Sequence, residues 1–363
     1  MARKLRPDWV LFIITLSLVI FGVVMVFSSS AVLAKADHEN PNYFSFKQIV
    51  AAVLGLAIMF VVMKVDYHLY RKPAVVFTVL SSAVALLVLV FFFAKVARTH
   101  RWIQISPISF QPSELAKLAL IFFLAYFLEK RKGQINDIQF TLAPVAIIVG
   151  VLALLIVKEP DLGTAIALLL TASILLFVAG LDLKWFAIPA AMSVPAFYLL
   201  VYRVPWRWER IMAFLHPDAD PQKFGYQINQ SLLSIGSGGI LGLGYMEGKQ
   251  KLFFLPQAHT DFIFAVVGEE LGLIGAFAIL ALFVVFLWRG LRTSAKAPDM
   301  FGFYLALGIT MMVCVQAFIN ISVVLALVPT KGIPLPFLSY GGSSFVVMLA
   351  SVGILLNVSQ QSS

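Results

Sequence analysis

The stretch "PQAHTDFIFAVVGEELGLIGAFAILALFVVFLW", residues 256–288, decides the fold class. Its second part, 271–288, contains no Lys, Arg, Asp or Glu. As an α-helix it would cross most of a bilayer's hydrocarbon core, which is about 30 Å thick. Four further uncharged runs lie at 10–34, 73–94, 162–181 and 300–330. The sequence therefore predicts an all-α, polytopic integral membrane protein.

The composition agrees, because only 12% of the 363 residues are charged and 61% are hydrophobic, whereas soluble domains carry about 25% charged residues. We expect one transmembrane domain, residues 1–363, with about ten helices and a large extracytoplasmic loop at about 203–260. With that loop set aside, Lys and Arg favour the side that holds both termini, which predicts cytoplasmic termini. The predicted spans are 9–34, 46–63, 73–94, 112–128, 140–157, 161–180, 185–202, 262–288, 301–328 and 337–357.

Basic residues also gather on the predicted outer face, before the fourth span and after the seventh. They suit an anionic ligand such as a lipid phosphate, and the alternative is that they snorkel and fix helix ends. These residues are Lys95, Arg98, Arg101, Arg203, Arg207 and Arg210.

The loop at 203–260 holds two further patterns. "GSGGILGLG" (236–244) could wrap a phosphate through backbone N–H groups, and the alternative is a flexible loop packed on the membrane. The apolar spacing within 224–236 predicts a short interfacial helix. The single Cys314 and the scattered histidines predict no disulfide and no metal cluster.

Ionisable residues inside membrane spans are costly and therefore mark candidate functional positions. In "QPSELAKL" (111–118), Glu114 and Lys117 are three residues apart, so they share one helical face and can pair. In "KEPDLG" (158–163), Asp161 follows Pro160 at the start of a helix, where capping of the helix is the alternative to a functional role.

Asp261 is the third such position, at the water-facing start of the eighth span. It is either a plain helix cap or a catalytic acid. His259 and Thr260 add hydrogen-bonding groups beside it. Glu269 and Glu270 lie about 12 Å further along the helix axis, and we expect them to be structural partners of a polar group on another helix.

The segment "NISVVLALVPTKGIPLPFLSYGGSS" (320–344) resembles the long motif of the SEDS family of cell-shape, division and sporulation proteins, which includes RodA, FtsW and SpoVE. The chain departs from that family where Ser322 and Ala326 replace glycines and where Lys331 replaces a threonine. Further family-like motifs follow in order over the whole chain: "RWI" (101–103), "FQPSELAKL" (110–118), "EPDLGTA" (159–165), "RIMAFLHPDADP" (210–221), "GYQINQSLLSIGSGG" (225–239) and "LPQAHTDFIFAVVGEELGLIG" (255–275).

The resemblance implies a peptidoglycan glycosyltransferase of the plasma membrane. Such an enzyme polymerises lipid II into a β-1,4 glycan strand at the outer face, with inversion and with undecaprenyl diphosphate as leaving group. One direct displacement needs one general base, and the motif places that base at Asp261.

The resemblance also implies roles for other residues. Arg101, Arg210, Lys117, Ser343 and Ser344 are expected to contact substrate, while Glu114, Asp161, His259, Thr260, Glu269 and Glu270 are expected to support the site. No cofactor is identified, although a divalent cation could share the diphosphate. The implied partners are lipid II, the growing glycan strand, a class B penicillin-binding protein and other membrane proteins of the elongation complex, with no nucleic acid.

The short termini favour the elongation type, RodA, over the division type, FtsW. A lipid II flippase that uses Glu114, Lys117 and Asp161 along a transmembrane path is the main functional alternative. A scaffold that only recruits the transpeptidase is another. Because the polar motifs gather at the outer ends of the spans, we favour chemistry at the outer surface.

Overall fold

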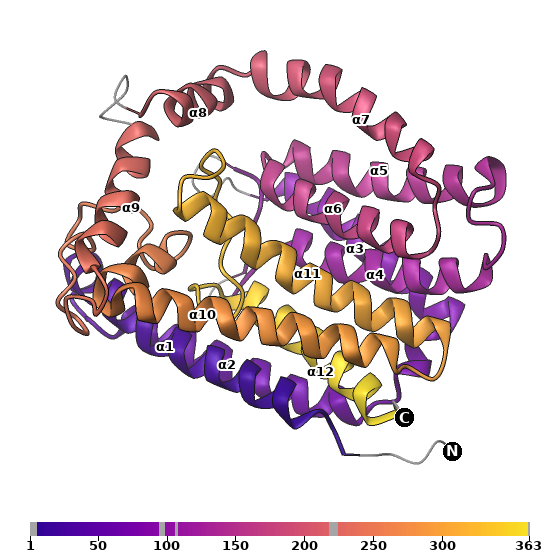
Figure 1. Ribbon diagram of the computed structural model, residues 1–363, viewed down its shortest axis with the longest axis horizontal. Helices are drawn as coiled ribbons and strands as arrows, with labels where there is room; N and C mark the ends of the chain where they lie inside the picture. The colour runs from indigo at the N-terminus through magenta and orange to yellow at the C-terminus, as the bar shows by residue number, and fades with distance from the viewer. Residues whose placement is uncertain (1–5, 94–98, 106–107, 218–223, 362–363) are drawn as a thin grey trace.

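The computed structural model describes residues 6–93, 99–105, 108–217 and 224–361 (Figure 1). Two predicted outer basic residues, Lys95 and Arg98, lie outside the described residues, as do 218–221 of the "RIMAFLHPDADP" motif.

Ten of the described helices correspond to the ten predicted spans. They are α1 (Trp9–His38), α2 (Tyr43–Lys64), α3 (Pro73–Leu89), α4 (Pro112–Lys130), α5 (Ala143–Lys158), α6 (Leu162–Val178), α7 (Leu183–Phe197), α10 (Ile263–Ala295), α11 (Met300–Val324) and α12 (Gly342–Gln361). Short 3₁₀ or π turns extend several of them: η1 (Tyr67–Arg71), η2 (Val90–Phe92), η3 (Ile138–Leu142) and η4 (Tyr198–Tyr202).

Within the described residues, eight helices are long and apolar enough to cross a membrane. Two predicted spans fall outside that group: α6 is short, with 17 residues, and α4 carries charged residues. Both pack inside the bundle, where most of the side chains of α4 are buried. The start of α1 and the end of α12 lie at the same end of the bundle in Figure 1. The prediction of an all-α, multi-pass membrane protein is confirmed.

Two predicted boundaries are wrong: the C-terminal end of the ninth span, 301–328, and the N-terminal end of the tenth span, 337–357. α11 ends at Val324 and α12 begins at Gly342, so the segment 325–341 is not helical. Pro329, Pro334 and Pro336 lack the backbone N–H that a helix interior needs, so a helix through this segment is disfavoured. The predicted interfacial helix is present as α9 (Phe224–Gly238). Helix α8 (Pro205–Leu215) and the antiparallel hairpin of β1 (Ile103–Ile105) and β2 (Ile108–Phe110), in which Gln104 pairs with Ser109, were not predicted.

Helix α10 is broken at Gly272, whose φ of 64° and ψ of −162° are not helical. Glycine adopts a positive φ without the steric penalty that other residues meet. The glycine-rich loop replaces the hydrogen bonds lost at the break. Gly239 and Ile240 accept from the N–H groups of Leu273 and Ile274, at 2.9 and 3.3 Å.

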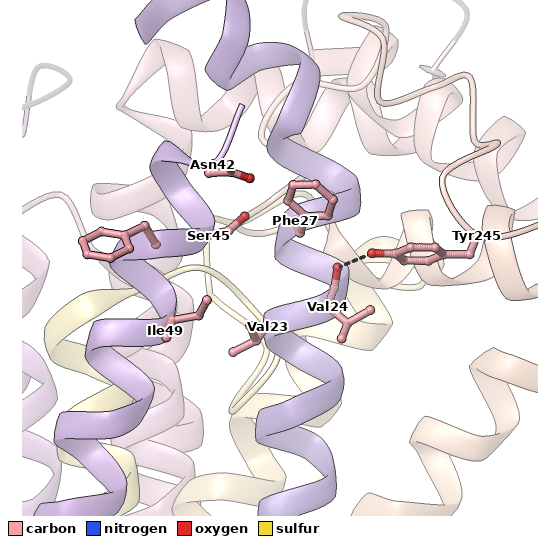
Figure 2. A pocket seen from close by; sticks show the side chains of 8 residues that line it. Val23, Val24, Phe27, Asn42, Ser45, Ile49 and Tyr245 are labelled. Carbon is pink, nitrogen blue, oxygen red and sulfur yellow. Dashed lines mark hydrogen bonds between the residues drawn. The ribbon is translucent and has the colours of Figure 1, made fainter. Parts of the chain in front are cut away.

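The same loop donates to the helix as well. The N–H groups of Leu243 and Gly244 bond to the carbonyls of Glu269 and Glu270, each at 3.0 Å. Because these N–H groups are already engaged, they are not free to wrap a phosphate, and the structure favours the alternative of a packed loop. The loop also reaches α1, since Tyr245 Oη donates to the carbonyl of Val24 at 3.2 Å (Figure 2).

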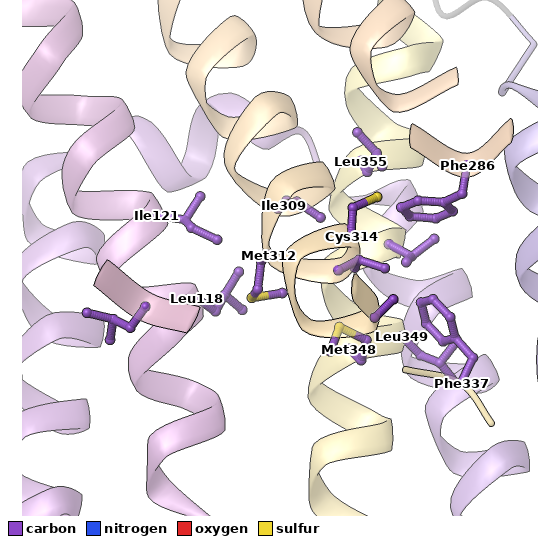
Figure 3. Packing of buried hydrophobic residues seen from close by; sticks show 14 of the residues in the cluster. Leu118, Ile121, Phe286, Ile309, Met312, Cys314, Phe337, Met348, Leu349 and Leu355 are labelled. Atoms are coloured by element: carbon purple, nitrogen blue, oxygen red, sulfur yellow. The ribbon is translucent and has the colours of Figure 1, made fainter. Parts of the chain in front are cut away.

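The core of the bundle lies between α4, α11 and α12. Figure 3 shows Leu118 and Ile121 of α4 beside Ile309 and Met312 of α11, with Met348 of α12 on the other side. Lipid tails are as apolar as these side chains, so close packing rather than removal from water holds such helices together. The core therefore provides a fixed frame for the loops at the end of the bundle away from the termini.

Candidate active site

A cavity of about 820 Å³ opens at that end of the bundle. Its lining comes from the start of the hairpin, the α5–α6 turn, α8, α9, and the segments that precede α10 and α12. Charged side chains of both signs line it: the cations are Arg101, Arg210 and Lys331, and the anions are Asp161 and Asp261.

Asp261 lies on the cavity wall just before α10. The first flanking residue of α10 is Phe262, and no side chain caps that helix end. The capping alternative for Asp261 is therefore wrong, which leaves its carboxylate available to the cavity. Asn320 fixes the backbone here, because its Nδ2 donates to the carbonyls of Asp261 and Ile333, at 2.8 and 2.7 Å.

The segment 330–341 holds the residues around Asp261 in place. Ser339 Oγ donates to the carbonyl of Thr260 at 2.6 Å, and the N–H of Tyr340 donates to the carbonyl of His259 at 3.0 Å. A Cβ added at Gly332 would lie only 2.7 Å from Oδ2 of Asp261. The long motif at 320–344 thus positions Asp261 by close backbone contact.

The electrostatic surroundings raise the pKa of Asp261 to about 7. Burial is the main cause, and the neighbouring Asp161 adds to it, while Arg101 and Arg210 oppose it. A general base works best when its pKa lies near the operating pH. The carboxylate of Asp261 is therefore suited to accept a proton at neutral pH.

Arg101 is already engaged with the α5–α6 turn. Its guanidinium donates to the carbonyls of Glu159 (3.3 Å) and Pro160, and its Nε lies 4.0 Å from Asp161 Oδ2. Asp161 caps α6, because Oδ1 accepts from the N–H of Thr164 at 3.1 Å and Oδ2 from its hydroxyl at 2.9 Å. The pair therefore fixes the rim of the cavity while keeping one cation and one anion on its wall.

Arg210 and Lys331 are the two other cations of the cavity wall. The Arg210 guanidinium donates to the carbonyl of Thr330 at 3.4 Å and lies 5.3 Å from the ring centre of Trp206. Burial lowers the pKa of Lys331 to about 8, against the influence of Asp161. Lys331 was noted in the sequence only as a departure from a motif, and no spacing marked it as a cavity residue.

Several other lining residues were also missed: Gln111, Thr164, Trp206, Gln227 and Gln257. Each lies in or beside a motif noted in the sequence, but a single uncharged polar or aromatic residue carries no separate signal. Of the other expected residues, Thr260 and Ser344 line the cavity.

Lys117, Glu114 and Ser343 do not line the cavity. Lys117 Nζ lies 2.9 Å from Glu114 Oε1 and donates to Gln316 Oε1 at 2.5 Å, in a buried cluster. The Ser343 hydroxyl accepts from the N–H of Gln111 at 3.0 Å. These residues join α4 to its neighbours, and a direct contact with substrate has no geometric support here.

His259 points into the protein rather than into the cavity. Its ring packs against Phe44, with ring centres 4.8 Å apart, and burial lowers its pKa to about 4. The imidazole is therefore neutral at physiological pH and fills space between α2 and the segment before α12.

Glu269 and Glu270 are fully buried and form a second polar cluster. Glu269 accepts from Ser234 Oγ and from the N–H groups of residues 249 and 250, at 2.7–3.1 Å. Glu270 accepts from Lys251 Nζ and from Ser28 Oγ, each at 2.6 Å. The expected polar partners therefore lie on α1, on α9 and in the loop that follows it.

The fold and the cavity define a multi-pass membrane protein with an acidic residue poised in a cation-lined site at one end of its bundle. The family model described as "Cell cycle protein", which covers FtsW, RodA and SpoVE, matches residues 8–363. The chain belongs to this family, as the sequence motifs predicted, and is a multi-pass protein of the plasma membrane.

Two curated relatives show the similarity over nearly the whole chain. The probable peptidoglycan glycosyltransferase FtsW of Geobacter metallireducens is 45% identical over 98% of this chain and 95% of its own length. Stage V sporulation protein E of Bacillus subtilis is 43% identical over 99% of each chain.

Two solved structures share the fold. The first matches with a TM-score of 0.80, at 26% identity and with 97% of each chain covered. It is described as "structural coordination of polymerization and crosslinking by a peptidoglycan synthase complex". The rod shape determining protein RodA of Thermus thermophilus matches with a TM-score of 0.73, at 26% identity, over 98% of this chain and 97% of its own. The two curated relatives thus carry the names of a division protein and a sporulation protein, whereas the sequence analysis favoured the elongation type.

Proposed function

We propose that this protein is a peptidoglycan glycosyltransferase of the division or sporulation type, which polymerises lipid II at the outer face of the plasma membrane. The observation that carries the proposal is the carboxylate of Asp261, uncommitted to helix capping, with a pKa near 7 in a cavity lined by cations. The names of the curated relatives support the same activity.

The proposed step is one displacement at the anomeric carbon of the donor sugar. Asp261 takes the proton of the acceptor hydroxyl, whose oxygen forms the new glycosidic bond. The bond between the anomeric carbon and the diphosphate oxygen breaks, and undecaprenyl diphosphate leaves with the electron pair. Since attack and departure are on opposite faces, the α-linked donor gives a β-linked product.

The leaving diphosphate gains negative charge as that bond breaks, so it needs positive groups nearby. Arg210 and Lys331 line the cavity and are the side chains that we assign to it, with Arg101 at the rim. The N-terminus of α12 adds a partial positive charge, because Gly341 and Ser344 at its start also line the cavity. Among the described residues, no group of three or more His, Cys, Asp or Glu forms a metal site. The diphosphate contacts that we assign to this chain are these cations and the helix end.

The flippase alternative has less support from the geometry. It relied on Glu114 and Lys117 as part of a polar path through the membrane, but these two side chains are buried and neutralise each other. The cavity lining, by contrast, comes from loops and helix ends at one side of the bundle. This arrangement favours chemistry at one surface over passage through the membrane.

We further propose that a class B penicillin-binding protein is the partner that cross-links the product, together with other membrane proteins of the division machinery. The likeness to a chain from a complex that couples polymerization to crosslinking supports this. The growing glycan strand and lipid II are the proposed acceptor and donor.

The deciding experiment is glycan polymerisation from purified lipid II by wild type and Asp261→Asn, each with the transpeptidase partner present. Asn is nearly isosteric but cannot accept the proton, so we expect chains from wild type and none from the variant. Folding and partner binding of the variant are checked in parallel. Equal polymerisation by both proteins would mean that Asp261 is not the base, and transport of lipid II without polymerisation by wild type would favour the flippase.

A further inference from the structure

A second pocket, which shares no lining residue with the cavity of Asp261, lies on the membrane-facing side of α1 and α2. It is a groove of about 440 Å³, within the range of about 300–1,000 Å³ that is usual for small-molecule sites. Its apolar lining comes from Val23, Val24 and Phe27 of α1 and from Phe46 and Ile49 of α2. Asn42, Ser45 and Tyr245 supply its polar groups.

The hydroxyl of Ser45 is the feature that points to a ligand. Ser45 is only 6% exposed, and its Oγ has no hydrogen-bond partner. Figure 2 shows this oxygen pointing from α2 into the space between α2 and α1. A buried polar group without a partner is destabilising, so an oxygen or nitrogen atom of a bound molecule is expected there. The hydroxyl of Tyr245 is already satisfied by the carbonyl of Val24.

The depth of Ser45 in the bilayer identifies the class of that molecule. Asn42 precedes α2 at the predicted outer interface, and Ser45 lies about one helical turn, roughly 5 Å, below it. That is the level at which a phospholipid carries its ester carbonyls, between the headgroup and the acyl chains. The apolar residues lie at or below this level, as far as Ile49 on α2 and Val23 on α1.

We propose that this groove binds one phospholipid of the outer leaflet, with an acyl chain along α1 and α2 and an ester carbonyl that accepts a hydrogen bond from Ser45. Tyr245 closes one side of the groove, and it belongs to the loop that Glu269 and Glu270 hold. The ligand therefore contacts the same loop that braces the outer part of α10.

The test uses the ester oxygen as a probe. Purified protein in detergent is titrated with diester phosphatidylcholine and with its diether analogue, which lacks the carbonyl, and bound lipid is counted by native mass spectrometry. We expect wild type to prefer the diester roughly fivefold, which corresponds to one neutral hydrogen bond. Ser45→Ala should lose that preference while still binding the acyl chain.

The matched control is Ser82→Ala on α3, because the Ser82 hydroxyl is exposed but already donates to the carbonyl of Val79 at 2.9 Å. This control should keep the preference of wild type. Equal binding of the two lipids by wild type, or the same preference in Ser45→Ala, would overturn the proposal. Displacement of the phospholipid by undecaprenyl phosphate at equal concentration would also overturn it, because the groove would then bind a polyprenyl chain rather than a phospholipid.

Discussion

Asp261 and the buried pair Glu269 and Glu270 lie within ten residues of each other, and they differ in whether their carboxylates have hydrogen-bond partners. Glu269 and Glu270 are saturated by Lys251, serines and backbone N–H groups. Asp261 faces a cavity, and neighbouring charges and burial set its pKa near 7. A carboxylate whose hydrogen bonds are all used stabilises a fold, whereas one that faces a cavity remains available for chemistry.

The largest expected effect is on polymerisation activity, which should distinguish Asp261 from Glu269 and Glu270. Asp261→Asn should lower the polymerisation rate by about 10²–10⁴-fold, the usual contribution of general base catalysis, with little loss of stability. Glu269→Gln should change the rate far less than that at equal amounts of folded protein, which initial-rate assays with lipid II would measure. A comparable loss of rate in both variants would remove the distinction.

Stability should show the reverse pattern. Glu270→Ala leaves Lys251 buried without its partner, and the loss of one member of a buried ion pair costs about 3–5 kcal/mol. The control is Glu129→Ala, which breaks the more exposed pair with Arg71 and should cost at most about 1 kcal/mol. Unfolding in detergent, followed by circular dichroism, would compare the two. Equal losses would show that the Glu270 cluster does not brace the loop.

Lys331 provides a further test of the cavity. Loss of a charge-assisted hydrogen bond costs about 1.5–3 kcal/mol, so Lys331→Met should slow polymerisation roughly tenfold or more. The pKa of Lys331 is near 8, and only its protonated form attracts the diphosphate. Wild-type activity should therefore fall as the pH rises past about 8, and Lys331→Met should lack this decline. Lys184→Met, at an exposed position, should behave like wild type.

The smallest expected effect is a shift along the pH axis. Asp261 acts as a base only when ionised, so activity should rise as the pH passes about 7. Asp161 raises this pKa, and Asp161→Asn should move the rise to lower pH while Asn still caps α6. The exposed Asp182→Asn should leave the profile in place. A shift to higher pH in Asp161→Asn would contradict the assignment.

Most of the fold could be predicted because uncharged runs mark membrane helices directly. The exceptions have physical causes. The segment 325–341 is apolar but contains prolines, so hydropathy alone extended α11 and α12 into it. The break at Gly272 gives no hydropathy signal, since a loop distant in sequence supplies its hydrogen bonds.

The site was predicted in part. Asp261, Arg101 and Arg210 were named from motifs, and all three line the cavity. Lys117 was also named from a motif, but its side chain pairs with Glu114 inside the bundle and does not line the cavity. Whether a side chain faces a cavity or a neighbouring helix depends on packing, which sequence spacing does not reveal. Lys331 was missed for the converse reason, because its role depends on the position of its loop.

The break in α10 has a mechanical consequence. A continuous helix of 33 residues would carry any tilt of its membrane part along its whole length, and tilt is how long helices adapt to bilayer thickness. In this protein the regular helix is interrupted at Gly272. The part of α10 that precedes the break, next to Asp261, is held by hydrogen bonds to the glycine-rich loop. We therefore expect the position of the Asp261 carboxylate to depend little on the thickness of the host membrane.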